Sequence, residues 1–190
     1  MKKLLFCIFV LIPNIAMAYE AAKYEVSKII SDEVEIREYE KMVLATIATN
    51  AETSQNDNFR ALFDFISGEN SEEESIKMTI PVFQKSNKKQ KIMSFVMPAE
   101  FKVSDLPRPN NTNIEFEIIE DAKFIAIRFS GRSTDENFAK YQKILEEDIK
   151  KHDISADLTK PINAYYNSPW TLPFLKRNEV LFPMYTKTHL

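Results

Sequence analysis

The first part of the chain alternates between apolar and polar positions with the period of a β-strand. Residues 24–30 have strand composition, and Val34–Tyr39 sets apolar and charged residues in turn, as a half-buried strand does. Residues 42–49 continue with β-branched and small side chains. The pattern therefore predicts three strands before the period changes.

A helix is predicted next, because apolar residues then recur at the spacing of one helical face. These residues are Phe59, Leu62, Phe63 and Ile66. Gly68 follows at the C-cap, a place that tolerates positive φ. After an acidic loop, residues 78–83 and 92–97 are predicted to be strands joined by a polar turn at 85–90. Pro81 within the first of them indicates an edge strand or a bulge.

The order of elements begins again after the loop at residues 106–111, the strongest punctuation in the chain. Residues 114–118 and 123–129 are predicted strands. Ser133 and Glu136 have the spacing of a capping box. The helix after them has an apolar face made by Phe138, Tyr141, Leu145 and Ile149. Residues 161–166 and 179–182 are the last predicted strands.

Each half thus reads strand, strand, helix, strand, strand, although the halves share little residue identity. We expect an α+β fold in which two βαββ-like units form a pseudo-twofold antiparallel sheet, curved toward a barrel, with two flanking helices. Alternating strands favour antiparallel pairing over buried parallel strands. The halves are expected at about 19–105 and 112–190, within a single domain at 19–190.

The N-terminus has the parts of a secretory signal peptide. Lys2 and Lys3 precede an uncharged run at 4–12, and Ala16-Met17-Ala18 supplies small residues two apart. The run is much shorter than the roughly 20 residues of a membrane-spanning helix, so no transmembrane anchor is expected. Such a signal would direct the protein to the periplasm or the medium, with cleavage near Ala18. Cleavage would also remove Cys7, the only cysteine, and with it any thiol chemistry.

Charge and glycine content exclude several classes of function. Loss of Lys2 and Lys3 takes the 25 basic residues to 23 against 28 acidic ones, a net charge of −5. Because the charges are interspersed, no nucleic-acid partner is expected. The chain has two glycines, so it holds no glycine-rich phosphate loop. It also lacks a nucleophile elbow and a His-Glu-x-x-His motif, so we expect a protein that is not an enzyme.

Several short runs, in order and spacing, resemble the SOUL haem-binding protein family. The runs are 24–26, 34–39, 59–68, 77–82, 94–98, 129–131, 166–170 and 177–180. The runs are spread along the chain, so the resemblance extends over nearly all of residues 20–183. The resemblance implies a pseudo-symmetric β-barrel that binds haem or other porphyrins in an apolar groove near the first helix, without a shared enzymatic reaction. The fold is also similar to effector-binding domains of bacterial regulators, which is an analogy of fold alone.

Haem usually needs an axial ligand, and histidine is scarce here. His152 is expected at the surface, at the end of the second helix, and His189 is the penultimate residue. Weak or absent axial ligation is therefore expected. The candidate pocket residues are methionines after the first helix, aromatic residues, and cations for the propionates. They are Phe59, Arg60, Phe63, Lys77, Met78, Met93, Met97, Tyr166, Trp170 and Arg177.

Each candidate also has a structural interpretation. The methionines and the pair Phe59 and Phe63 are expected to fill the core more often than to face a ligand, and Arg177 is expected to pair with Glu179 or cap a strand edge. The acidic residues at 69–74 match no cation-binding loop. The leading hypothesis is an exported protein that binds haem or a related tetrapyrrole. A binding module for another apolar small molecule or a protein is the alternative, and a tetrapyrrole-modifying enzyme is a third. The oligomeric state stays open.

Overall fold

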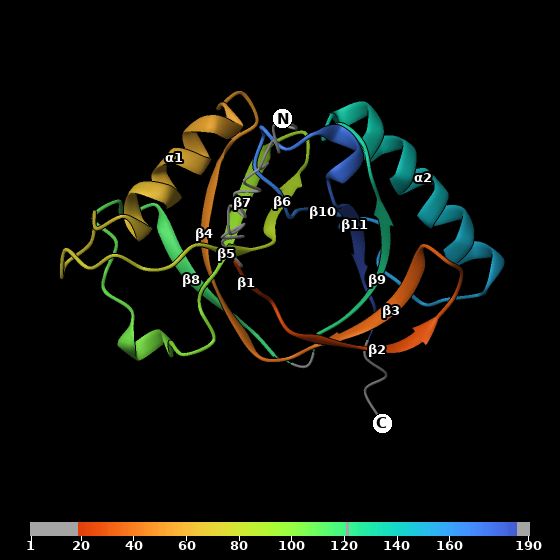
Figure 1. The fold of residues 1–190 in the computed structure, drawn as a ribbon, viewed down its shortest axis with the longest axis horizontal. Coiled ribbons are helices and arrows are strands. Elements are labelled where there is room, and N and C mark those ends of the chain that lie inside the picture. The colour runs from red at the N-terminus through yellow and green to blue at the C-terminus, as the bar shows by residue number, and fades with distance from the viewer. Residues whose placement is uncertain (1–18, 121, 186–190) are drawn as a thin grey trace, which may run out of the picture.

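The computed structural model describes residues 19–120 and 122–185. Figure 1 shows one strongly curved antiparallel sheet with a helix packed outside each half. The strands, in spatial order, are β2 (Tyr24–Ile29), β3 (Val34–Tyr39), β9 (Ala122–Phe129), β11 (Asn178–Pro183), β10 (Ile162–Tyr165), β6 (Val82–Ser86), β7 (Gln90–Val96), β4 (Met42–Asn50) and β8 (Ile114–Ile119). The predicted α+β class is confirmed. Because the edge strands β2 and β8 do not pair with each other, the sheet is a half-barrel.

The predicted duplication is present, and the two units exchange strands. The first unit is β3, β4, α1 (Gln55–Ile66), β6 and β7, and the second is β8, β9, α2 (Asp135–Lys151), β10 and β11. β3 pairs with β9 of the second unit, whereas β8 pairs with β4 of the first. β6 and β10 join the units at the centre of the sheet. Each unit therefore supplies an outer strand to the other.

Helix α1 forms where predicted, but its buried face is rotated from the one expected. Ser54 caps its N-terminus, and Gly68 follows the last turn with φ of 116°. The buried residues are Asn58, Leu62, Phe65 and Ile66, so Phe59 and Phe63 lie at the margin of that face. The reason is that Asn58, polar in the sequence, turns inward and exchanges hydrogen bonds with Thr49 of β4.

Helix α2 starts one residue later than the predicted capping box requires. Thr134 is the N-cap, and its hydroxyl accepts a hydrogen bond from the backbone N–H of Asn137. Ser133 instead donates to the side chain of Asn178 on β11. The Ser133–Glu136 box is thus wrong, because the serine hydroxyl is used by the sheet. The predicted apolar face is otherwise right, with Phe138, Leu145 and Ile149 buried.

The predicted strand at 78–83 is two strands that belong to different sheets. Thr79–Ile80 is β5, which pairs with β1 (Glu20–Ala21), and β6 starts at Val82. Pro81 lies between them because proline cannot donate to a strand ladder. β6 is flanked by β10 and β7, so the expectation of an edge strand is wrong for β6, whereas β5, within the described residues, has β1 as its one neighbour.

Three hydrophobic clusters divide the interior. One lies between α1 and the sheet around Leu62 and Phe95, and another lies between α2 and the sheet around Leu145 and Phe182. The third occupies the concave face, around Leu44 and Leu181. Successive residues of β4 alternate between the α1 cluster and the concave cluster, as the period of two requires. Central strands are consequently buried on both faces.

The N-terminal segment runs across the open side of the half-barrel (Figure 1). Ala22 donates a backbone hydrogen bond to Ile80, and Glu40 donates one to Lys23. These bonds tie the segment to β5 on one side and to the β3–β4 turn on the other. Within residues 19–120 and 122–185, no helix is long and apolar enough to cross a membrane.

Candidate functional site

A pocket of about 510 Å³ opens beside the N-terminal segment, where β4 begins and β7 ends. It is lined by residues from β1 to the start of β2, by the first residues of β4, by residues 96–104 and by Ile118 of β8. Met97 belongs to the α1 cluster and Met42 to the concave cluster. The pocket thus lies where these two clusters meet, and its volume suits a small organic ligand.

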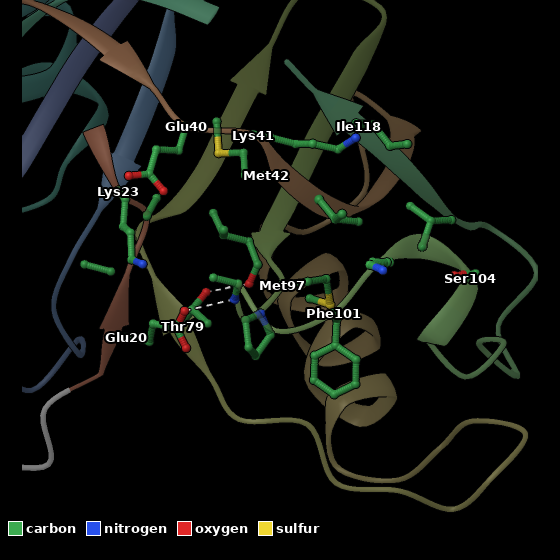
Figure 2. A pocket seen from close by; sticks show the side chains of 18 residues that line it. Glu20, Lys23, Glu40, Lys41, Met42, Thr79, Met97, Phe101, Ser104 and Ile118 are labelled. Atoms are coloured by element: carbon green, nitrogen blue, oxygen red, sulfur yellow. Dashed lines mark hydrogen bonds between the residues drawn. The ribbon is translucent and has the colours of Figure 1, made fainter. Parts of the chain in front are cut away.

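The floor of this pocket is apolar and its rim is charged. The apolar contacts come from Met42, Val43, Met97, Phe101 and Ile118, and the cations are Lys23, Lys41 and Lys102. In Figure 2, Met97 lies beside Phe101, whereas Met42 lies on the other side of the pocket near Lys41. Two acids also line the rim, Glu20 and Glu40.

Two of the rim charges already have partners. Glu20 accepts a hydrogen bond of 2.9 Å from the backbone N–H of Ala99, and Lys41 forms an ion pair with Glu120. The apolar side chains of the lining suit an apolar ligand, the lysines can bind carboxylates, and a methionine thioether can ligate iron. Met42 and Met97 lie on different sides of the pocket.

A second group of side chains, the buried charge network, lies on the concave face of β3, β10 and β11. It consists of Tyr24, Arg37, Tyr39, Tyr166, Arg177 and Glu179. Arg37 is 1 % exposed and Glu179 is fully buried. The Arg37 guanidinium donates two hydrogen bonds to the Glu179 carboxylate, at 2.5 and 3.0 Å. Such a bidentate pair is the strongest geometry available to these two groups.

The Glu179 carboxylate is saturated with donors. One oxygen accepts from Arg37 Nη2 and from Arg177 Nε, and the other accepts from Arg37 Nη1 and from the Tyr166 hydroxyl at 2.9 Å. The guanidinium of Arg37 also lies over the ring of Tyr24, and that of Arg177 lies over the ring of Tyr166. A carboxylate has about four sites for donors, so Glu179 has none left for a substrate proton.

The pKa shifts agree with this neutralised arrangement. Burial alone would raise the pKa of Glu179, but the hydrogen bonds and charges of Arg37 and Arg177 lower it below its ordinary value. Burial raises the pKa of Tyr39 to about 12. The pKa of Tyr166 is raised further, first by burial and then by the charge of Glu179. The network is therefore ionised at Glu179 and the arginines and neutral at Tyr39 and Tyr166 near pH 7, as a structural core would be.

The candidates on α1 do not enclose an apolar groove. Phe59 and Phe63 are 41 % and 46 % exposed and stack on each other with ring centroids 6.0 Å apart. Arg60 lines a separate groove of about 450 Å³ on the same helix. That groove is polar, with Asp57, Asp64 and Glu69 in its lining. These carboxylates would repel propionates, so the apolar pocket beside β4 suits such a ligand better.

The methionine candidates divide between core and pocket. Met93 is buried in the α1 cluster, and Met78 packs against that cluster while partly exposed. Met97 is buried as well but also lines the 510 Å³ pocket. Lys77 is exposed on the loop before β5. The core interpretation of the methionines is confirmed for Met93.

The C-terminal candidates lie in three different environments. Tyr166 is buried in the charge network, and Arg177 pairs with Glu179, as the structural interpretation of Arg177 predicted. Trp170 is 92 % exposed on the loop between β10 and β11. His152 is exposed at the C-terminus of α2, as expected, and His189 lies outside the described residues. The ten candidates are thus distributed over the molecule, and Met97 is the one that lines the apolar pocket.

Sequence reasoning found the pair of Arg177 and Glu179 but not the rest of the network, and it did not find the rest of the pocket. Lys23, Lys41, Met42, Lys102 and Phe101 lie in segments that are adjacent only after the N-terminal segment crosses the sheet. The sequence held one signal for the network: β3 alternates, so Arg37 lies on the face opposite the strand's first apolar residues. The partner of Arg37 is 142 residues away, however, and one sequence does not identify it.

Comparison with known proteins supports the fold. The chain is similar in structure to a hydrolase from Listeria innocua, at a TM-score of 0.60 and 8 % identity, covering 80 % of this chain and 92 % of the other. It is similar to the EcmrR C-terminal domain at a TM-score of 0.57 and 14 % identity, covering 81 % of this chain and 98 % of that domain. It is also similar to SAV2435 bound to tetraphenylphosphonium at a TM-score of 0.51 and 9 % identity, covering 80 % of this chain and 94 % of the other.

At these identities the similar structures establish the fold and leave the activity open. No curated protein matches the sequence. A family model described as SOUL heme-binding protein, however, matches residues 19–183, which include every described helix and strand. The chain therefore belongs to the SOUL haem-binding protein family.

Proposed function

We propose that this protein binds haem or a related tetrapyrrole in the pocket beside β4, without catalysing a reaction on it. The observation that carries the proposal is the composition of that pocket: an apolar floor with methionines under a rim that includes Lys23 and Lys102. Membership of the SOUL haem-binding family supports the same ligand class. Apolar packing supplies the binding energy, and the lysines orient the propionates.

The expected affinity is moderate because no histidine lines the pocket. Binding by packing and lysine contacts alone corresponds to a Kd near 1 μM, about −8 kcal/mol. Haem would supply an iron centre there, and Met42 or Met97 would be its ligand from this chain. Replacement of either by leucine removes the thioether at nearly constant volume.

A haemin titration of the chain lacking residues 1–18 tests the proposal. Saturable change of the Soret absorption with micromolar midpoint is expected. Lys102→Glu and Ile118→Glu place carboxylates in the lining and should weaken binding by about tenfold each, since 1.4 kcal/mol corresponds to a factor of ten. Met97→Leu should alter the Soret position more than the midpoint if Met97 ligates the iron.

The matched control is the aromatic pair on α1. Phe59→Ser and Phe63→Ser remove exposed apolar side chains outside the pocket, so they should leave the midpoint unchanged. Loss of binding in these two variants, with none in Lys102→Glu, would move the ligand to α1. Absence of any saturable spectral change would defeat the proposal itself. Conversion of haemin to a metal-free spectrum would contradict the non-catalytic part.

A second ligand class is suggested by SAV2435, whose structure holds tetraphenylphosphonium. In the present chain the buried carboxylate of Glu179 is neutralised by two arginines, so it offers little attraction to a lipophilic cation. We therefore expect tetraphenylphosphonium to leave the haemin midpoint unchanged. Saturable competition would instead favour a module for varied apolar molecules.

Export is part of the proposal, based on the signal-like N-terminus. Mature protein should begin at Tyr19, which mass spectrometry of the protein recovered from the periplasm or the medium would measure. Recovery of the intact N-terminus from the cytoplasm would contradict export.

A further inference from the structure

The loop between β10 and β11 exposes more apolar surface than any comparable segment of the described chain. We call residues 168–177 the apolar loop; it contains η2 (Pro173–Leu175). Four of its side chains are more than half exposed: Trp170 at 92 %, Leu172 at 56 %, Phe174 at 71 % and Leu175 at 62 %. Single exposed apolar residues are ordinary, but four within six positions form a patch that indicates an interaction surface.

The backbone of this loop is tied internally. The N–H groups of Thr171, Leu175 and Lys176 donate to carbonyls within the loop, and that of Arg177 donates to the Asn167 side chain at 2.6 Å. The carbonyl of Pro173 accepts from Gly131 at 2.9 Å, which anchors the loop beside the start of α2. Pro169 and Pro173 carry no N–H at all. The apolar side chains are therefore held outward by an ordered backbone.

This combination fits entry into the interface of a lipid bilayer. Backbone groups that enter a membrane are favoured when they are hydrogen-bonded within the protein, and the N–H groups of Trp170, Thr171, Leu175, Lys176 and Arg177 meet that condition. Tryptophan is the residue enriched at the membrane–water boundary, and Leu172, Phe174 and Leu175 are suited to the acyl region beneath it. A bilayer also accepts separate protruding side chains, whereas a protein partner would need a matching pocket for each.

The charges around the loop are compatible with a lipid surface. From residue 158 to residue 178 the chain has no acidic residue, and its charged residues are Lys160, Lys176 and Arg177. Arg132 follows the glycine that anchors the loop and is exposed, although Asp135 and Glu136 begin α2 close by in sequence. Because this balance is near neutral, apolar contact rather than charge carries the binding.

We propose that the apolar loop inserts into the interface of a phospholipid bilayer and holds the domain at a membrane surface. This inference is independent of the tetrapyrrole pocket, whose lining contains no residue of the loop. With four apolar side chains and no acyl chain, the attachment is reversible and comparable with that of one myristoyl group, on the order of 10⁴ M⁻¹ in lipid.

The experiment uses Trp170, the only tryptophan of the chain, as its own probe. The chain lacking residues 1–18, so that the signal-like segment cannot bind lipid, is mixed with phosphatidylcholine vesicles, with and without one quarter phosphatidylglycerol. Tryptophan emission should shift to shorter wavelength, and the protein should co-sediment with the vesicles. Binding should change little between low and high salt.

Phe174→Ser and Leu175→Ser retain the tryptophan and should weaken partition by about tenfold each, the cost of one apolar side chain that is no longer buried. Ile29→Ser removes a side chain that is 71 % exposed on β2, so it is the matched control and should leave partition unchanged. Absence of an emission shift and of co-sedimentation at millimolar lipid would overturn the proposal. Lipid-independent dimerisation that Phe174→Ser abolishes would assign the loop to self-association and overturn it too.

Discussion

Two regions of the sheet use their charged residues in opposite ways. Around β3 and β11 the concave face carries the buried charge network, in which every oxygen of Glu179 already has two donors. Around the start of β4 and the end of β7, where the concave cluster meets the α1 cluster, lies an open pocket with an apolar floor and lysines at the rim. Charges within the concave face are thus used for stability, whereas Lys23 and Lys102, which lie outside the strands, remain available to a ligand.

Arg37 and Glu179 are a buried pair of opposite charges, yet they are a poor candidate for a catalytic acid and base. A perturbed carboxylate often marks a functional site. Here the pKa of Glu179 is lowered by two arginines rather than raised toward neutrality, so the group stays ionised and fully bonded. Stability and ligand binding should therefore respond to different substitutions.

The largest expected effect is on the free energy of unfolding of Glu179→Gln. This change removes the carboxylate that Arg37 and Arg177 share and leaves Arg37 with the partly exposed Glu35 as its ion-pair partner, a loss of about 3–5 kcal/mol. Urea unfolding followed by circular dichroism measures it. Lys41→Gln breaks only an exposed ion pair with Glu120 and serves as the control, at about 0–1 kcal/mol. Equal losses in the two variants would show that the network is no more important than a surface pair.

A double-mutant cycle sharpens the same point. Arg37→Met together with Glu179→Gln should cost less than the sum of the single changes, with a coupling of roughly 2–3 kcal/mol, because each single change takes one ion-pair partner from the other side chain and the double variant does not incur that cost twice. Additive losses would mean that the two side chains stabilise the fold independently.

Acid should lower the stability of the fold through the buried charge network. The folded pKa of Glu179 lies below its ordinary value of 4.5, so its contribution is present above pH 4.5 and is lost as pH falls through the folded pKa. The urea midpoint of the wild-type chain should fall below pH 4.5 more steeply than that of Glu179→Gln. Parallel curves would assign the acid sensitivity to other carboxylates.

Alkali tests the tyrosines in the opposite direction. The pKa of Tyr39 is raised from 10.0 to about 12, so the unfolded chain loses this proton first and stability falls between those two pH values. Tyr39→Phe should remove part of that fall, as measured by thermal unfolding at pH 9 and pH 11. An unchanged slope would mean that another group causes it.

The smallest expected effect on stability is that of the rim. Lys102 is an exposed loop residue. Lys102→Glu should therefore change the free energy of unfolding by less than about 0.5 kcal/mol, although it weakens haemin binding. Glu179→Gln should show the reverse, with lower stability and an unchanged haemin midpoint where the chain is folded. A variant of either kind that alters both properties equally would contradict the division of roles between the network and the pocket.

Local patterns were enough for the elements and the duplicated order, and the ordered short runs were enough for the family. Periods of 2.0 and 3.6 depend on side chains close in sequence, and these placed both helices and most strands correctly. They failed where a polar residue bonds to a side chain of the sheet: Asn58 bonds to Thr49 of β4, and Ser133 bonds to Asn178 of β11. The pocket was missed for the same reason, since its lining comes from five separate segments. Trp170 was misjudged because an aromatic residue between prolines has no period from which to infer burial.

The exchange of outer strands between the units has a consequence for how the chain reaches its fold. A break in the loop at 106–111 would leave one fragment with β3 but without its partner β9, and the other with β8 but without its partner β4. Neither half can complete its sheet before the whole chain is present, so the decisive pairings join residues far apart in sequence. Such topologies fold slowly, in milliseconds to seconds. The two-unit protein is in this sense one cooperative unit.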